Sequence, residues 1–123
     1  MNARTPSLDL TELQARLRAF SAERDWDQFH SPKNLACALS VEASELLELF
    51  QWLSDDQARS APADPAFAER LGEEVSDVLL YLLRLADVTG LDLSAVVERK
   101  LALNAQKYPV EQSRGSSRKY DEL

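Results

Sequence analysis

The stretch LGEEVSDVLLYLLRLA, residues 71–86, decides how this chain folds, because it holds too many apolar residues for a surface helix. At about 100° per residue, the apolar side chains extend well around the helix, and they are Val75, Val78, Leu79, Leu80, Leu82, Leu83 and Leu85. A helix that is apolar almost all round is buried on most sides. One chain of 123 residues has too few helices to surround it. We therefore expect a homo-oligomer, a dimer or a tetramer, in which this helix meets its symmetry mate.

Three further segments have helical periodicity, at residues 10–24, 31–53 and 92–108. Asp9, Ser31-Pro32 and Asp64-Pro65 are typical helix starts, and Gly90 is a typical helix end. Residues 54–63 are polar and are predicted to form a loop, and no strand pattern stands out. We therefore predict an all-α fold, an antiparallel four-helix bundle. Residues 1–107 would form a single domain and residues 108–123 a polar C-terminal tail.

The composition is typical of a globular protein, with 45% hydrophobic and 28% charged residues and a formal net charge of -7. This negative charge disfavours binding to nucleic acid or to an anionic membrane. Cys37 is the only cysteine, which excludes an intrachain disulfide and a zinc site built on cysteines. Because neither a signal peptide nor a transmembrane run is visible, we expect a cytoplasmic protein without membrane partners.

Two pairs of acidic residues interrupt the apolar helices at helical spacing: Glu42 with Glu45, and Glu74 with Asp77. Residues three apart on a helix are neighbours, with Cβ atoms about 5–6 Å apart. Such pairs usually decorate a solvated helix face. On a helical wheel, however, Glu42 and Glu74 fall inside the apolar stripes, which favours a buried cluster of four carboxylates. Buried like charges repel unless they are protonated or neutralised by cations.

The residue types of this cluster restrict the metal that it could bind. Di-iron bundle proteins combine Glu with Glu-x-x-His pairs, whereas the only histidine, His30, lies in neither acidic pair. Ligation by carboxylate oxygens alone indicates Mg²⁺, with Mn²⁺ as an alternative.

Aromatic residues flank the acidic pairs along the sequence. Trp26 and Phe29 lie beside His30 in the first connection, Trp52 ends the second predicted helix, and Tyr81 lies one turn beyond the second acidic pair. Each of them could simply pack in the core. An acidic metal cluster beside aromatic rings nevertheless suits a nucleotide, because metals bind the phosphates while the rings stack on the base.

Further motifs stand at residues 23–30 (ERDWDQFH), 49–52 (LFQW), 74–81 (EVSDVLLY), 107–110 (KYPV) and 113–115 (SRG). Together with the acidic pairs, they resemble the all-α nucleoside triphosphate pyrophosphatases, the MazG-like superfamily, and within it the dCTP pyrophosphatase group. The resemblance covers about residues 10–121 and implies Mg²⁺-dependent hydrolysis of a nucleoside triphosphate to the monophosphate and pyrophosphate. Its substrate would be dCTP or a modified dCTP, and its role sanitation of the nucleotide pool. One departure is Leu17, which stands where animal members carry a histidine, so the base and sugar preference stays open.

The same resemblance implies roles for individual residues. The metal ligands and catalytic residues would be Glu42, Glu45, Glu74 and Asp77. The substrate-binding residues would be Trp26, Asp27, Gln28, Phe29, His30, Trp52, Tyr81, Lys100 and Asn104. We take Glu45 as the proton acceptor, although nothing in one sequence distinguishes it from Glu42.

Two noncatalytic functions fit the same residues. One is a helical adaptor whose acidic cluster binds a basic partner. The other is a nucleotide-binding regulator without turnover.

Overall fold

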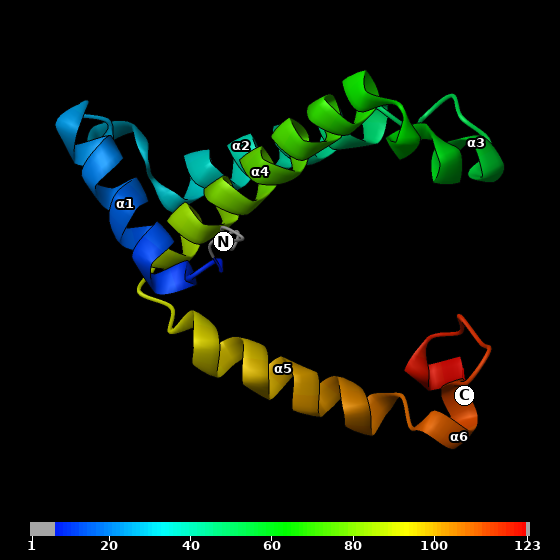
Figure 1. The fold of residues 1–123 in the computed structure, drawn as a ribbon. Helices are drawn as coiled ribbons and strands as arrows, with labels where there is room; N and C mark the ends of the chain where they lie inside the picture. The colour runs from blue at the N-terminus through cyan, green and yellow to red at the C-terminus, as the bar shows by residue number, and fades with distance from the viewer. Residues whose placement is uncertain (1–6, 123) are drawn as a thin grey trace, which may run out of the picture. The chain divides into compact units, whose positions relative to one another are not determined.

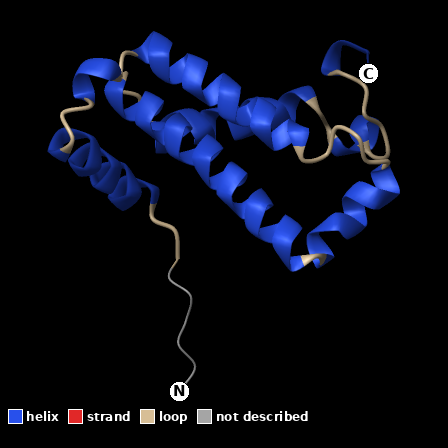
Figure 2. Cartoon of the chain, turned by 90° about the horizontal axis from the view of Figure 1, so that it is seen from above, coloured by secondary structure: helices blue, strands red, loops and turns tan. Residues whose placement is uncertain are grey.

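The computed structural model describes residues 7–122, and all regular structure in this range is helical (Figures 1 and 2). The elements are α1 (Leu10–Glu23), η1 (Asp27–Phe29), α2 (Pro32–Glu48), α3 (Asp55–Ser60), η2 (Ala61–Ala63), α4 (Pro65–Val88), α5 (Leu93–Lys107), α6 (Val110–Ser113) and η3 (Tyr120–Glu122), where η denotes a 3-10 helix. The predicted all-α fold class is confirmed. None of the described helices combines the length and the apolar character needed to cross a bilayer.

The chain divides into two compact units at the end of α4. The first unit runs up to Gly90 and the second begins at Leu91. Gly90 ends α4 with φ +73°, a left-handed conformation that favours glycine. The division into a domain at residues 1–107 and a tail at 108–123 stays a prediction, as does the packing of α5 in a four-helix bundle.

The four longer helices begin at residues whose side chains cap them. The side chains of Asp9, Ser31, Asp64 and Asp92 each accept a hydrogen bond from a backbone N–H two or three residues further on. Such a bond satisfies one of the N–H groups that the first turn of a helix leaves unpaired. The predicted starts at Asp9, Ser31 and Asp64 are confirmed, and Asp92 is the cap of α5.

The loop predicted at residues 54–63 is wrong, because this segment forms α3 and η2. The Ser54 hydroxyl accepts from the Gln57 backbone N–H at 3.2 Å, and the Gln57 side-chain oxygen accepts from the Ser54 N–H at 2.9 Å. This reciprocal capping box stabilises a helix of six residues. Such a helix is too short to show apolar periodicity in the sequence.

The second predicted helix also ends earlier than expected. α2 stops at Glu48, so Trp52 lies in the turn beyond it instead of ending the helix, with 86% of its surface exposed. The tail after α5 contains regular structure as well, in α6 and η3. There the rings of Tyr108 and Tyr120 meet edge to face at 6.2 Å, and Lys107 Nζ lies 4.7 Å from the Tyr120 ring centroid.

The first unit is built around α2 and α4, which run antiparallel side by side (Figure 1). α1 also packs on α4, and Gln14 donates a side-chain hydrogen bond to the Leu83 carbonyl at 3.2 Å. The buried apolar residues of the described chain are few: Leu35, Phe67, Leu83 and Ala86. Around this small core, Val75 and Leu82 of α4 are 49% and 44% exposed. The apolar surface of α4 thus extends beyond what its neighbours in the first unit cover.

We expect the protein to be a dimer or a tetramer by size-exclusion chromatography with light scattering, as a multiple of 13.8 kDa. Val75 and Leu82 are seven residues apart and share one side of α4. Leu82→Asp should therefore lower the measured mass at micromolar concentration, because a charge would be buried in the apolar contact. Val110→Asp, at a more exposed apolar position on α6, serves as the control. A wild-type mass of one chain would contradict this expectation.

Candidate active site

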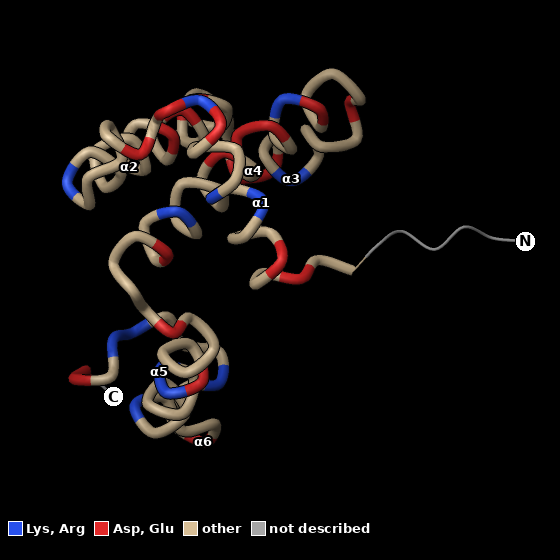
Figure 3. Tube along the Cα trace, turned by 90° about the vertical axis from the view of Figure 1, so that its left-hand side faces the viewer, with Lys and Arg blue, Asp and Glu red and all other residues tan. Residues whose placement is uncertain are grey.

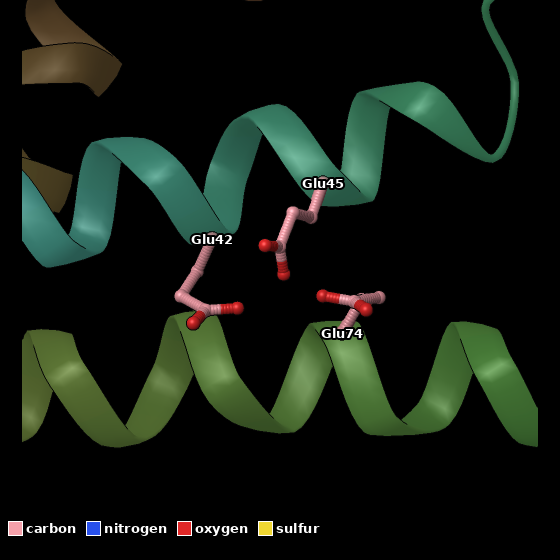
Figure 4. A group of neighbouring side chains, drawn as sticks. All are labelled: Glu42, Glu45 and Glu74. Carbon is pink, nitrogen blue, oxygen red and sulfur yellow. The ribbon is translucent and has the colours of Figure 1, made fainter.

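Three of the predicted carboxylates meet between the two central helices. Glu42 and Glu45 extend from α2 and Glu74 extends from α4, and their side chains point toward one another (Figure 4). One carboxylate oxygen of each residue lies within 4.8 Å of the others. Figure 3 shows the acidic positions of both helices in red. The spacing seen in the sequence therefore brings acids from distant segments into one cluster.

The cluster is partly removed from solvent. Glu42 Oε2 and Glu74 Oε2 are buried and have no hydrogen-bond partner within the described chain. An unpaired buried carboxylate oxygen is costly, because it has lost its bonds to water without gaining others. These two oxygens are free to bind a cation.

The pKa values of the cluster reflect the same situation. Burial, followed by the adjacent Glu45 carboxyl group and then by the charges of Asp77 and Glu74, raises the pKa of Glu42 to about 7. Burial also raises the pKa of Glu74, with Glu45 and Asp77 contributing further. Both effects disfavour the ionised form. A bound cation would act in the opposite sense and favour the ionised carboxylates.

The donor set fits a hard divalent cation. It consists of carboxylate oxygens, two of which lack any other partner, and their mutual repulsion is relieved by positive charge. Asp77 lies outside the three-residue group but close enough for its charge to act on Glu42 and Glu74. The residues that would hold a metal are thus Glu42, Glu45 and Glu74, with Asp77 beside them.

A cavity of about 180 Å³ adjoins this cluster and is mainly apolar and aromatic. It is lined by Leu17, Phe20, Ser21, Trp26, His30, Asp77, Leu80, Tyr81 and Arg84. Trp26 meets Phe20 edge to face at 5.6 Å and His30 at 6.3 Å. Asp77 belongs to the wall of the cavity, and its charge also acts on the acidic cluster, so the two features are neighbours.

The cavity contains some of the predicted substrate-binding residues and not others. Trp26, His30 and Tyr81 line it, whereas Phe29 and Trp52 are 60% and 86% exposed and do not. Asp27 and Gln28 do not line the cavity either, and their side chains form hydrogen bonds with other residues.

Asp27 Oδ1 accepts from Arg84 at 2.7 Å. The Gln28 amide donates to the backbone carbonyl of Asp25 at 3.0 Å and to its carboxylate at 3.1 Å. Asp25 has φ +55°, and these bonds support its left-handed backbone.

Lys100 and Asn104 lie on α5 in the second unit. Their part in the site stays a prediction.

Sequence reasoning did not single out Phe20, Ser21 or Arg84 as members of the cavity. For Arg84 a signal was present. It interrupts an apolar run and follows Asp77 and Tyr81 at helical spacing, which places the three on one face of α4. For Ser21 and Phe20 no comparable signal exists, because both fit an ordinary amphipathic helix.

Comparison with known proteins relates this chain to one family. Residues 37–123 match the MazG-like family. The chain is 45% identical to dCTP pyrophosphatase 1 of Rattus norvegicus over 119 residues, 97% of this chain and 70% of the relative. It is 44% identical to dCTP pyrophosphatase 1 of Homo sapiens over the same shares. A solved pyrophosphatase from Archaeoglobus fulgidus is similar with a TM-score of 0.76 and 38% identity, covering 88% of this chain and 99% of that one.

The helical fold is thus that of an all-α pyrophosphatase. The chain belongs to the MazG-like family. Its enzyme class is nucleoside triphosphate pyrophosphatase, the class of the relatives that match it over nearly its whole length.

The raised pKa of Glu42 predicts how stability depends on pH. A carboxyl group whose pKa rises on folding favours the folded state at low pH, and this contribution is lost as the pH rises from about 4.5 to about 7. In EDTA, we expect Glu42→Gln to raise the unfolding temperature at about pH 8 and to change it little at about pH 4.5. Differential scanning calorimetry measures both.

Glu48→Gln is the matched control, because Glu48 is the exposed last residue of the same helix. It should leave the unfolding temperature nearly unchanged at either pH. If Glu42→Gln changed stability equally at both pH values, the carboxylates would not repel one another as described.

Proposed function

We propose that the protein is an Mg²⁺-dependent pyrophosphohydrolase that converts dCTP, or a modified dCTP, to the monophosphate and pyrophosphate. The observation that carries this proposal is that Asp77 lies in the wall of the aromatic cavity and close enough to the acidic cluster for its charge to act on it. A nucleoside triphosphate has the same two parts, an anionic chain that requires cations and a flat base that stacks on rings. Hydrolysis of such a compound would serve to clear it from the nucleotide pool.

The size of the cavity favours a pyrimidine. At about 180 Å³, it is close to the roughly 150 Å³ of an apolar cavity that holds a benzene ring. A single six-membered ring fits this space better than the fused rings of a purine. The names of the relatives, dCTP pyrophosphatase 1, support the same base.

The chain's own residues would divide the work of the reaction. Glu42, Glu45 and Glu74 would hold the cation, which when bound neutralises phosphate charge and activates a water. Trp26 and Tyr81 would hold the base in the cavity and so align the triphosphate with the acids. We choose Glu45 as the acceptor of the proton from the attacking water, because neither of its carboxylate oxygens is both buried and without a hydrogen-bond partner.

The direct test is a panel of all NTPs and dNTPs with Mg²⁺, with pyrophosphate release as the readout. We expect release to be fastest with dCTP or a modified dCTP and to stop in EDTA, because the phosphates cannot approach the acids without a cation. Mn²⁺ should restore part of the activity. Absence of release with every nucleotide would reject the proposal in favour of a noncatalytic adaptor, and binding without release would favour a regulator.

Glu45→Gln should reduce kcat by about a hundredfold or more, because it removes a charged ligand and the proposed proton acceptor. Its unfolding temperature should not fall, since the substitution relieves repulsion in the cluster. Glu48→Gln, on the exposed end of α2, should keep wild-type kcat. Normal Mg²⁺-dependent turnover by Glu45→Gln would contradict the assignment of the site.

A further inference from the structure

Arg84 is a buried charge in an apolar part of α4, only 6% exposed. Its neighbours along the helix are Leu83, Leu85 and Ala86. A buried guanidinium is tolerated only where acceptors surround it. Each of its three guanidinium nitrogens has an acceptor: Nε donates to His30 Nδ1 at 3.1 Å, Nη1 to Asp87 at 3.3 Å and Nη2 to Asp27 at 2.7 Å.

These bonds belong to a longer chain of alternating charges. Arg18 of α1 donates to both oxygens of Asp87, one of them at 3.0 Å. Asp87 in turn accepts from Arg84, which also donates to Asp27 of η1. Two cations and two anions therefore compensate one another across α1, α4 and η1. Arg18 lowers the pKa of Asp87 against the effect of burial, which keeps that carboxylate ionised.

The neutral member of this network is His30, and its bond to Arg84 fixes its tautomer. An arginine Nε always carries hydrogen and can only donate, so His30 Nδ1 must be an unprotonated acceptor. Ser21 Oγ lies 3.4 Å from the same nitrogen. In the neutral ring the hydrogen is then on Nε2, which has no hydrogen-bond partner among residues 7–122.

The charges around His30 keep the ring neutral. Burial and then Arg84 lower the pKa of His30, and Asp27 opposes them more weakly. The charged and titratable groups in the hydrogen-bond network and the cavity wall around His30 are Arg18 from α1, Asp27 from η1, and Asp77, Tyr81, Arg84 and Asp87 from α4. The neutral ring has one N–H donor, and His30 lies in the wall of the aromatic cavity.

We propose that Arg84 is a positioning residue that holds His30 as the Nε2–H tautomer, so that the cavity binds a base presenting a hydrogen-bond acceptor. The acceptor would be a carbonyl oxygen or an unprotonated ring nitrogen, and cytosine has both. This inference rests on the proposed function for its substrate. The geometry of Arg84 and His30 does not depend on that function.

The hold on His30 can be tested without any nucleotide. The chain has one histidine, so the imidazole signals of ¹⁵N-labelled protein are assigned without ambiguity. At about pH 7 we expect one neutral ring with hydrogen on Nε2. In Arg84→Met the titration midpoint of His30 should move upward, because the cation that opposes protonation is gone. A ring protonated on Nδ1 in the wild type, or an unchanged midpoint in the variant, would overturn the proposal.

Steady-state kinetics with dCTP and Mg²⁺ then test the consequence for binding. Arg84→Met should fold, because Asp87 would keep its ion pair with Arg18 and the Asp27 side chain, which is 57% exposed, would be solvated by water. We expect its KM to rise about three- to tenfold, the effect of losing one positioned hydrogen bond, with kcat nearly unchanged. Arg59→Met, at an exposed arginine of α3, is the matched control and should change neither.

A double-mutant cycle separates positioning from general packing. In a His30→Ala background, Arg84→Met should add less than about a twofold change in KM, because both substitutions remove the same donor. An equal rise in KM in both backgrounds would show that Arg84 does not act through His30. If the wild type released no pyrophosphate from any nucleotide, the proposed function would fail while the NMR result would still decide how His30 is held.

Discussion

Electrostatic repulsion among Glu42, Glu45 and Glu74 is opposed by the packing of the helices that carry them. Burial of Leu35 and Leu83 favours close contact between α2 and α4, and that contact brings the three carboxylates within 4.8 Å of one another. The unpaired oxygens and the raised pKa values are the result. The fold therefore holds a site that is unfavourable when empty. Preorganised charge of this kind would bind a cation with little rearrangement.

The fold class could be predicted because the long helices carry clear local signals. Asp9, Ser31 and Asp64 cap helices where the sequence places them, and the apolar period of α4 is unmistakable. α3 could not be predicted in the same way. Its six residues have no apolar face, and it depends on the hydrogen bonds between Ser54 and Gln57. Where such short capped segments occur, apolar periodicity contains no information about them.

The acidic cluster was also predictable, since Glu42 and Glu74 stand in apolar stripes where solvated acids do not belong. The aromatic wall was predictable only in part. Trp26 and Tyr81 line the cavity, but Asp27 turns to Arg84 instead. That contact joins segments far apart in the sequence, and helical spacing alone cannot indicate it. Helical spacing shows which residues share a face, whereas a partner on another element becomes visible only once the helices have packed.

The left-handed residue Asp25 has a consequence for how ligands enter the site. Gln28 donates hydrogen bonds to both the backbone carbonyl and the carboxylate of Asp25. The bend between α1 and α2 is therefore fixed before a ligand binds. A preformed aromatic wall loses little conformational entropy on binding. Inserted or deleted residues should therefore be tolerated better in the exposed segment between α2 and α4 than in the short bend between α1 and α2. In that bend, one added residue would turn Trp26 away from its cavity.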